Sequence, residues 1–540
     1  MRKFESRGAK ALRFAGWIRP TQGRKPQSAV ITWTAVLLAL NLAWRTVRYG
    51  LAFPIWGDEA FVAVNLFKNN FLDFLQPLDH AQIVPLLFVW TEWGIAKLFG
   101  YHELAIRFLP FLAGIASLFL FSRLAFTVLS GHRALASVAI FAASFYPVRH
   151  AAEIKPYSTD LLVSLALLTI AWRLKNARDR LGGWVLFTLI SAIAVWASYS
   201  AVFVSGGILL VFGATAWRDG SRSILPKVFC SGVVLAASFA GMYVLVGKAQ
   251  AQAAPWLVTL PTWSFTFPPL AKPWLLPLWF LDVHTGNMFA YPNGGSVVTT
   301  LLFVGGVCAL WSRHRFIVLL LLSPLPLMFI AAALRAYPYG GSARVAMHVA
   351  PAVCLLAGSG LVAVVSRFSN PRNSLRIMYS IYTLCSLAIG AGIAVDIVRP
   401  FKSVADLRDR QIVQTLAGAT AKEDQWVIFG GTTNQPHAPN LFQWGGSAAR
   451  FRFNVLRYAQ FPVYWGPTPA NAVKSDRGRT WLIVYRDNKA QMPEDLLGRY
   501  LREMADRFGA PTMDRYRLGD DKEMIFVYRF DNPAAKARGS

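Results

Sequence analysis

The chain has 540 residues, of which 55% are hydrophobic and only 15% are charged, whereas soluble proteins average about 25% charged residues. This composition excludes an ordinary string of soluble domains and a disordered chain. The four cysteines all lie in apolar stretches, so they indicate neither a disulfide framework nor a metal cluster. The net charge of +27 would suit nucleic acid only if the basic residues formed one continuous face. They are instead distributed between apolar segments, and no nucleic-acid partner is expected.

Apolar runs of nearly membrane-spanning length recur along the chain. A bilayer core about 30 Å thick needs roughly 20 apolar residues in a helix. We count eleven such runs, at 28–49, 105–123, 133–148, 158–174, 183–199, 200–217, 228–247, 296–312, 316–334, 345–365 and 377–397. The sequence therefore predicts a mainly α protein of the cell (inner) membrane, a multispan transmembrane helical bundle with about eleven spans.

Basic residues in the short connections set the expected orientation, because such residues stay on the cytoplasmic side. The N-terminal tail, residues 1–27, is strongly basic, and further basic turns occur near 173–180, 218–227, 313–315 and 367–376. Placing all of these inside makes the N-terminus cytoplasmic. It also places the loops 51–104 and 248–295 and the C-terminal region outside.

The segment 83–99 is apolar but contains Glu92 and Lys97. If it crossed the membrane, Asp58 and the segment 149–157 would lie on opposite sides. We therefore interpret it as an amphipathic helix in the outer interface, with Glu92 on its polar face. The first outer loop, 51–104, is thus expected to carry interfacial helices.

After the last span the chain becomes more polar. Alternating patterns predict strands and 3.6-residue patterns predict amphipathic helices; the strands are expected at 426–429, 480–485 and 524–530, and the helices at 403–417 and 493–508. We therefore expect a transmembrane catalytic domain over 28–399 and a small extracytoplasmic α/β domain over 400–532. The tail 533–540 is expected to be disordered.

The first outer loop opens with an acid pair, Asp58 and Glu59. Ionisable groups at a membrane face are costly unless they are used, so a site is expected in the outer loops. One interpretation is structural: Asp58 caps the following helix and Glu59 interacts favourably with its dipole. The other is that the pair takes part in catalysis.

Two more outer segments accompany the acid pair, Ala152–Tyr157 (AEIKPY) and Arg335–Arg344 (RAYPYGGSAR). Together with the long first outer loop, this arrangement resembles the GT-C membrane glycosyltransferases, in particular the protein O-mannosyltransferase and aminoarabinose-transferase-like group. The resemblance covers residues 28–400 in order and topology. It implies transfer of a sugar from a polyprenyl-phosphate donor to an extracytoplasmic acceptor. The chain departs from the group at His80–Leu86, where a His-Pro-Pro-Leu-like sequence is frequent, and at Lys155, where arginine is common.

Such a transfer needs a base for the acceptor hydroxyl or amine, and a carboxylate is suited to it. We predict that Asp58 is the base and that Glu59 orients it or is the second candidate. The leaving lipid phosphate needs cations, and the candidates in the outer loops are Arg149, Lys155, Arg335 and Arg344. For the three arginines, the alternative is that they only reach lipid headgroups.

Several other residues are candidates for substrate binding, and they are Tyr157, Tyr337, Tyr339, His80, Asp160, Asp282 and His284. The tyrosines are alternatively interface anchors. The loop 248–295, rich in proline and tryptophan, suits a lid over a lipid or acceptor groove, or alternatively an aromatic plug. No cofactor is expected; a divalent metal held by Asp282 and His284 with Asp58 is the alternative.

No Gly-rich nucleotide-binding loop follows a strand in the sequence, which agrees with a lipid-linked donor. The expected partners are this donor, an extracytoplasmic acceptor (glycan, lipid or protein) and the bilayer. Two alternatives stay open, a transporter or flippase of lipid-linked sugars and a non-catalytic membrane scaffold. Transporters tend to contain paired repeats, and the sequence contains none that we detect.

Overall fold

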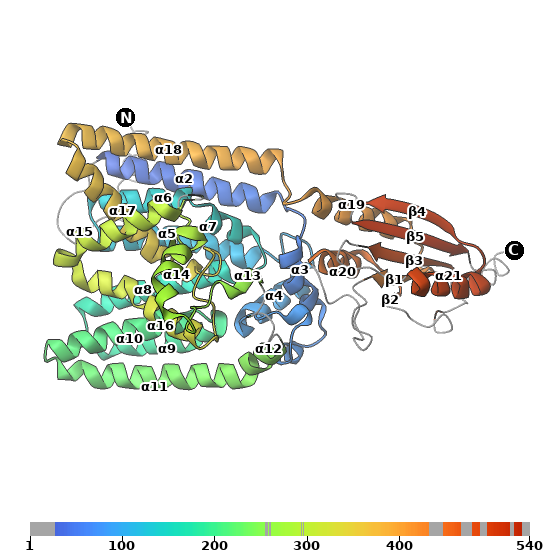
Figure 1. The fold of residues 1–540 in the computed structure, drawn as a ribbon, viewed down its shortest axis with the longest axis horizontal. Coiled ribbons are helices and arrows are strands. Elements are labelled where there is room, and N and C mark those ends of the chain that lie inside the picture. Colours follow the sequence, from blue (N-terminus) through green and yellow to red (C-terminus); the bar gives the residue numbers. More distant parts are fainter. Residues whose placement is uncertain are drawn as a thin grey trace, which may run out of the picture.

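The computed structural model describes residues 28–253, 258, 261–292, 294, 296–430, 446–465, 473, 478–486, 494–518 and 523–531. It consists of a bundle of long helices and, beyond one end of the bundle, a small α/β domain (Figure 1). The predicted basic tail, residues 1–27, and the predicted disordered tail, 533–540, lie outside the described residues.

All eleven predicted apolar runs are helical. The bundle contains α2 (Ser28–Gly50), α5 (Phe108–Val128), α6 (Gly131–Ala143), α8 (Tyr157–Asn176), α9 (Leu181–Ala197), α10 (Ala201–Arg218), α11 (Leu225–Met242), α15 (Ser296–Leu322), α16 (Pro324–Ala333), α17 (Ala350–Phe368) and α18 (Pro371–Val398). The prediction of a mainly helical transmembrane bundle is confirmed.

Among the described residues, eight helical stretches are long and apolar enough to cross a membrane. The difference from eleven has three sources. The helices α6, with 13 residues, and α9, with 17, are short for a span. The helices α15 and α16 count as one stretch, Ser296–Ala333, although the backbone at His314 leaves the helical region (φ −132°, ψ 35°) between the two predicted runs.

Close backbone contacts and buried polar groups hold the bundle together. A Cβ atom on Gly306 of α15 would lie 1.9 Å from the carbonyl oxygen of Leu356, so α15 and α17 touch through their backbones. At the end of α18, Asp396 accepts a hydrogen bond from Trp44 (2.8 Å) and forms an ion pair with Arg48, both on α2. The two contacts of Asp396 fix the end of α18, from which the chain enters the C-terminal domain.

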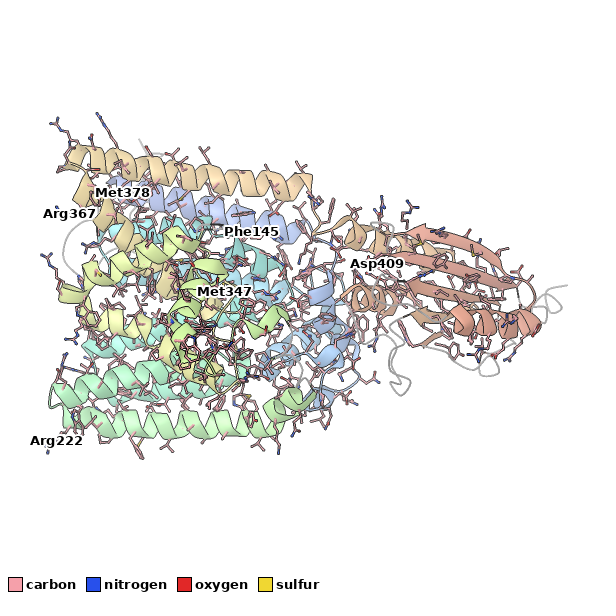
Figure 2. All side chains as sticks on the ribbon, viewed as in Figure 1. Phe145, Arg222, Met347, Arg367, Met378 and Asp409 are labelled. Atoms are coloured by element: carbon pink, nitrogen blue, oxygen red, sulfur yellow. The ribbon has the colours of Figure 1, made fainter. Side chains whose placement is uncertain are left out.

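The two ends of the bundle differ. Arg222 and Arg367, from two of the basic turns, lie at the end remote from the C-terminal domain (Figure 2). That these two turns share one end agrees with the predicted topology. Toward the opposite end lie short helices of the expected outer loops, α3 (Gly57–Ala63), α4 (Leu86–Phe99), α7 (Phe145–Arg149), α12 (Lys248–Ala253) and α13 (Pro261–Ser264). The helix α14 (Leu276–Val283) lies nearer the middle of the bundle in this view.

The helix α4 covers the predicted interfacial segment, and its 14 residues are too few to span a bilayer. The expectation that Glu92 lies on a polar face is wrong, because its side chain is fully buried. The reason is that α4 packs against α9 on one side and the turn Phe71–Leu75 on another. Burial raises the pKa of Glu92 well above its usual range.

The C-terminal domain contains one five-stranded sheet. Its strands are β1 (Gln425–Gly430), β2 (Val463–Trp465), β3 (Arg479–Arg486), β4 (Thr512–Arg517) and β5 (Met524–Asp531), in the order β2-β1-β3-β5-β4. The strand β1 pairs in parallel with β2 and β3, and β5 is antiparallel to β3 and β4. Sequence patterning missed β2, which has three residues, and β4, whose two faces are both largely solvated.

Helices cover both faces of this sheet. On one face, α19 (Val404–Ala419) and α20 (Gly446–Tyr458) pack on alternate residues such as Trp426 and Ile483. On the other face, α21 (Glu494–Phe508) packs on Val427, Leu482 and their neighbours. The central strand β3 is buried on both faces and therefore reads as a continuous apolar run.

The C-terminal domain docks on the first outer loop. Arg457 and Arg410 both pair with the buried carboxylate of Glu103, at 2.7 and 3.1 Å, and Arg452 pairs with Asp79 at 2.9 Å. The first residues of α3 and α20 approach even more closely. A Cβ atom on Gly57 would lie 2.5 Å from the Cα of Gly446, so the two backbones are in contact immediately before Asp58.

Candidate active site

Asp58 is the second residue of α3 and its carboxylate bridges two cations. Its Oδ1 lies 3.2 Å from Nζ of Lys155, and its Oδ2 lies 3.1 Å from Nη1 of Arg344. The alternative that Asp58 caps the helix is wrong, because the N-cap position is Trp56 and no side chain caps it. Three segments that are far apart in the sequence thus meet at one carboxylate.

The two cations also keep Asp58 ionised. Burial by itself would raise the pKa of this carboxyl, but the nearby charges of Lys155 and Arg344 outweigh burial, and the pKa is lowered overall. Lys155 is almost completely buried and also donates a hydrogen bond to Gln82 Oε1 (3.1 Å). Lys155 therefore contacts the carboxylate of Asp58 from the buried interior of the protein.

Glu59 does not share the environment of Asp58. Arg107 donates to both of its carboxylate oxygens (2.8 and 2.6 Å), and the backbone N–H of Ile154 donates to Oε1 (2.8 Å). All of these groups are buried. The expectation that Glu59 acts as or orients the base is therefore corrected: it anchors α3 to the segments of Arg107 and Ile154.

A second buried carboxylate, Glu153, organises the cation Arg149. Its Oε1 accepts from Arg149 Nε (2.7 Å) and Trp56 Nε1 (3.1 Å), and Oε2 lies 2.8 Å from His150 Nδ1. Burial alone would raise the pKa of Glu153, but His150 and Arg149 lower it overall. Burial lowers the pKa of His150, while the nearby carboxylate of Glu153 acts in the opposite direction.

Arg344, the partner of Asp58, and Arg149, the partner of Glu153, line a cavity of about 270 Å³. Cations and aromatic rings line it together with the backbone of a glycine-rich turn; the lining residues are Trp56, Tyr146, Arg149, Trp263, Phe265, Thr266, Gly340, Gly341, Ser342, Arg344 and Lys402. They come from the first outer loop, the end of α7, the loop around α13, the segment before α17 and the linker after α18. All of these segments except α7 were expected on the outer side; Tyr146 of α7 belongs to the end of the run 133–148, which was expected to span the membrane.

The glycine-rich turn needs its glycine at position 341. Gly341 has a φ of +77°, and a Cβ atom there would lie 2.5 Å from Cγ2 of Thr266. The turn can therefore lie directly against the loop around α13. This contact places Arg344, whose guanidinium is 5.7 Å from the ring centre of Trp263, between the cavity and Asp58.

Lys402 was not among the predicted residues. Its ammonium lies over the ring of Trp56, 2.7 Å from the ring centre, and the guanidinium of Arg149 is 5.2 Å from that centre. Partial burial and the nearby charge of Arg149 lower the pKa of Lys402 to about 8. Together, Arg149, Arg344 and Lys402 give the cavity a positive wall.

The structure does not bring every candidate to this cavity. Arg335 is exposed just after α16 and does not line the cavity, whereas Arg344 of the same segment does. The expected role of Arg335 as a phosphate ligand stays a prediction that the cavity does not support. His80 is buried in the turn Asp79–Ala81, with its ring 5.2 Å from that of Phe61.

The remaining aromatic and acidic candidates pack around the site without lining the cavity. Tyr157 stacks edge-on against His150 (4.8 Å), and Tyr337 packs against Phe203 (5.1 Å). Asp160 is buried in α8 and bonds to the hydroxyls of Ser198 and Ser200. We therefore assign these three residues to the support of the site and not to direct contact with substrate.

The proposed metal ligands do not converge. Asp282 is exposed on α14, whereas His284 contacts the carbonyl of Phe280 (2.6 Å) and Tyr339 Oη (3.3 Å). Tyr339 is itself buried among the aromatic rings of this loop. Within the described residues, no group of three or more His, Cys, Asp or Glu is arranged to hold a metal ion. Asp58, Asp282 and His284 therefore do not form a common group in the part of the chain that the structure describes.

Sequence reasoning missed Trp56, Tyr146, Glu153, Trp263 and Lys402. Glu153 lies within the quoted AEIKPY segment, and Trp56 is two residues before Asp58, so their neighbourhood was a usable signal. The sequence also contained a signal for Lys402, because a basic residue just beyond a span on the expected outer side departs from the positive-inside pattern.

Comparisons with known proteins concern the family resemblance and the fold. A family model described as dolichyl-phosphate-mannose-protein mannosyltransferase matches residues 83–243. The crystal structure of ArnT from Cupriavidus metallidurans in the apo state superimposes with a TM-score of 0.55 at 13% identity, and the match covers 94% of this chain and 99% of ArnT. The chain has the GT-C fold. The expected resemblance to GT-C membrane glycosyltransferases is confirmed.

A second ArnT structure from the same organism, bound to undecaprenyl phosphate, gives a TM-score of 0.53 at 13% identity over 92% of this chain and 98% of that one. The apo oligosaccharyltransferase of Archaeoglobus fulgidus also aligns, with a TM-score of 0.45 at 13% identity, over 92% of this chain and 74% of that one. A search of curated protein sequences gives no match. The GT-C fold thus extends over the bundle and the C-terminal domain.

Proposed function

We propose that the protein is an integral-membrane glycosyltransferase that transfers a sugar from a polyprenyl-phosphate donor to an extracytoplasmic acceptor. The single observation that carries this proposal is that Arg344, one of several cations lining a cavity at the outer end of the bundle, pairs with the ionised carboxylate of Asp58. ArnT, which shares the fold, has been crystallised with undecaprenyl phosphate. The matching family model is named for a lipid-phosphate-dependent sugar transfer.

In the proposed reaction, a hydroxyl or amine of the acceptor attacks the anomeric carbon of the donor sugar. The bond between that carbon and the phosphate oxygen breaks, and the lipid phosphate leaves with the electron pair. The acceptor proton passes to Asp58. Arg149 and Arg344 stabilise the negative charge that the phosphate gains, and no cofactor is invoked.

Arg344 links the two halves of this reaction. In the free protein it neutralises Asp58, and a carboxylate held in this way is a weak base. A phosphate in the cavity competes with Asp58 for the same guanidinium, so donor binding raises the basicity of Asp58. Proton transfer is thereby favoured only when the donor is present.

The aromatic part of the cavity wall suits the sugar. Trp56, Tyr146 and Trp263 present rings beside the cations, and aromatic rings pack well against the apolar faces of sugar rings. The lipid chain is expected to lie along the bundle, whose outward surface is apolar. The loop around α13 supplies three lining residues, Trp263, Phe265 and Thr266, which supports the idea that it covers the bound donor.

The proposal is tested by mass spectrometry of envelope glycolipids, glycans and proteins from cells with the gene, without it, and with Asp58→Asn. We expect one glycosylated product to disappear in the absence of the gene and in the variant. The control is Asp219→Asn, which alters an exposed ion pair near Arg222 at the other end of the bundle. Unchanged products without the gene contradict the proposal, and movement of lipid-linked sugar without any product indicates a flippase.

A further inference from the structure

The cations near the cavity differ in whether a carboxylate already neutralises them. Arg149 is paired with Glu153 at 2.7 Å, and Lys155 and Arg344 both pair with Asp58. Lys402 forms none of the ion pairs found among the described residues. Asp58, Glu153 and Asp406 act on it only through longer-range attraction.

The position of Lys402 adds to the excess of positive charge beside the cavity. Its ammonium and the guanidinium of Arg149 share the ring of Trp56, so two like charges lie close together beside the cavity. Water solvates such a pair only in part, because the rings of Trp56 and its neighbours cover one side. An anion in the cavity relieves this repulsion, and a phosphate group is the anion that the donor supplies.

Fixed elements on both sides hold Lys402 in place. Four residues before it α18 ends, where Asp396 is bound by Trp44 and Arg48. The next residue, Ser403, is the N-cap of α19, with a capping box in which Ser403 Oγ and Asp406 bond each other's backbone N–H groups. Arg450 of α20 in turn pairs with Asp406 at 2.7 Å. The linker between the bundle and the C-terminal domain is therefore a fixed arm and not a loose tether.

We propose that Lys402 is a ligand of the donor phosphate. The linker to the C-terminal domain places this lysine at the wall of the cavity. This inference rests on the proposed function and deepens it. It assigns part of the donor site to the junction of the two domains, so that the C-terminal domain takes part in donor binding through the arm that holds Lys402. The bundle alone supplies the other cations.

The test measures binding of undecaprenyl phosphate to the purified full-length protein in nanodiscs, with neutral undecaprenol as the reference lipid. A charge-assisted contact to phosphate predicts that Lys402→Ala weakens binding of undecaprenyl phosphate about tenfold or more. Binding of undecaprenol is expected to be unchanged. Lys402→Arg, which keeps the charge, is expected to restore most of the affinity, and Lys422→Ala, an exposed lysine at the start of the outer sheet, is expected to behave as wild type.

Each outcome has a defined meaning. Equal affinities of the wild type and Lys402→Ala for undecaprenyl phosphate overturn the inference and leave the proposed function standing. An equal loss of both lipids in Lys402→Ala also overturns it, since the effect is then not on phosphate. A wild-type protein that binds undecaprenyl phosphate no better than undecaprenol contradicts the proposed donor class itself, which separates failure of the function from failure of this inference.

Discussion

Arg344 Nη1 lies 3.1 Å from Oδ2 of Asp58, although 286 positions separate the two residues in the chain. This contact joins the turn before α17 to the start of α3 and places one charge of each sign at the cavity. Together with the nearby charge of Lys155, it lowers the pKa of Asp58 below its usual range in spite of burial.

Replacement of Asp58 by asparagine is expected to reduce sugar transfer by about 10²–10⁴-fold, because the side chain keeps its size but cannot accept the proton. The melting temperature is expected to change by only a few degrees, since the partially open site lets water solvate Arg344. Transfer assays and thermal unfolding of the same preparation test both statements. Near wild-type transfer by the variant rules out Asp58 as the base.

The pair Glu59–Arg107 is expected to matter for stability. Both side chains are buried and joined by two hydrogen bonds, so Arg107→Ala leaves an unpaired carboxylate in the interior and costs about 3–5 kcal/mol. The matched control is Arg178→Ala, which breaks an exposed pair with Asp219 at 3.7 Å and is expected to cost less than about 1 kcal/mol. Thermal unfolding of the detergent-solubilised proteins compares the two. Equal stability of both variants contradicts the assignment of Glu59 as an anchor.

The contact between Gly57 and Gly446 predicts an indirect effect on activity. A side chain at position 446 collides with the backbone of Gly57, next to Asp58, and a shift of about 1 Å in a catalytic group lowers the rate about 10²-fold. We expect Gly446→Val to lose transfer while the C-terminal domain stays folded. The control Gly498→Ala, at a helical position with no atom within 4 Å of the added Cβ, is expected to keep full activity. If both variants are fully active, docking of the C-terminal domain does not position Asp58.

The pH dependence of donor binding follows from Lys402. Its pKa is about 8 in the free protein, so its positive charge is present below this pH and is lost as the pH rises above it. A bound phosphate raises this pKa, which places the midpoint at or above pH 8. Affinity for undecaprenyl phosphate is therefore expected to fall between pH 7 and pH 10 in the wild type and to stay level in Lys402→Arg, because arginine stays charged. A wild-type affinity without this decline argues against a role of Lys402 in binding.

Metal chelation gives a further test. Because Lys155 and Arg344 already occupy both carboxylate oxygens of Asp58, we expect EDTA to leave the transfer rate unchanged. A loss of transfer that Mg²⁺ or Mn²⁺ restores contradicts this expectation and revives the metal alternative.

The sequence predicts the parts of this protein that depend on local patterns. Apolar runs locate the helices of the bundle. The expected strand segments locate β1, β3 and β5, although β3 is buried on both faces and does not alternate. The pairing of side chains is different. Asp58 and Glu59 are adjacent in the chain, yet one pairs with Lys155 and Arg344 and the other is buried against Arg107, and only the packing of α3 decides which.

The same holds for the cations. Arg335 and Arg344 occur in one outer segment and have the same charge, but a turn around Gly341 brings only Arg344 to Asp58. Lys402 lies outside all the segments that the resemblance marks, and it reaches the cavity because α18 and α19 end and begin where they do. Long-range placement of this kind depends on the folded chain and is not encoded in any short motif.

The bare backbone contact between the first turns of α3 and α20 has a consequence for engineering. Neither Gly57 nor Gly446 can be replaced by a residue with a side chain without a collision. A C-terminal domain taken from another protein therefore fits only if it has a glycine at the position of Gly446 and approaches α3 at the same angle. Chimeras designed by sequence boundaries alone are therefore expected to fail even when each half folds, and a successful graft has to transfer the junction, residues 399–410 and 446–457, as one block with its receiving loop.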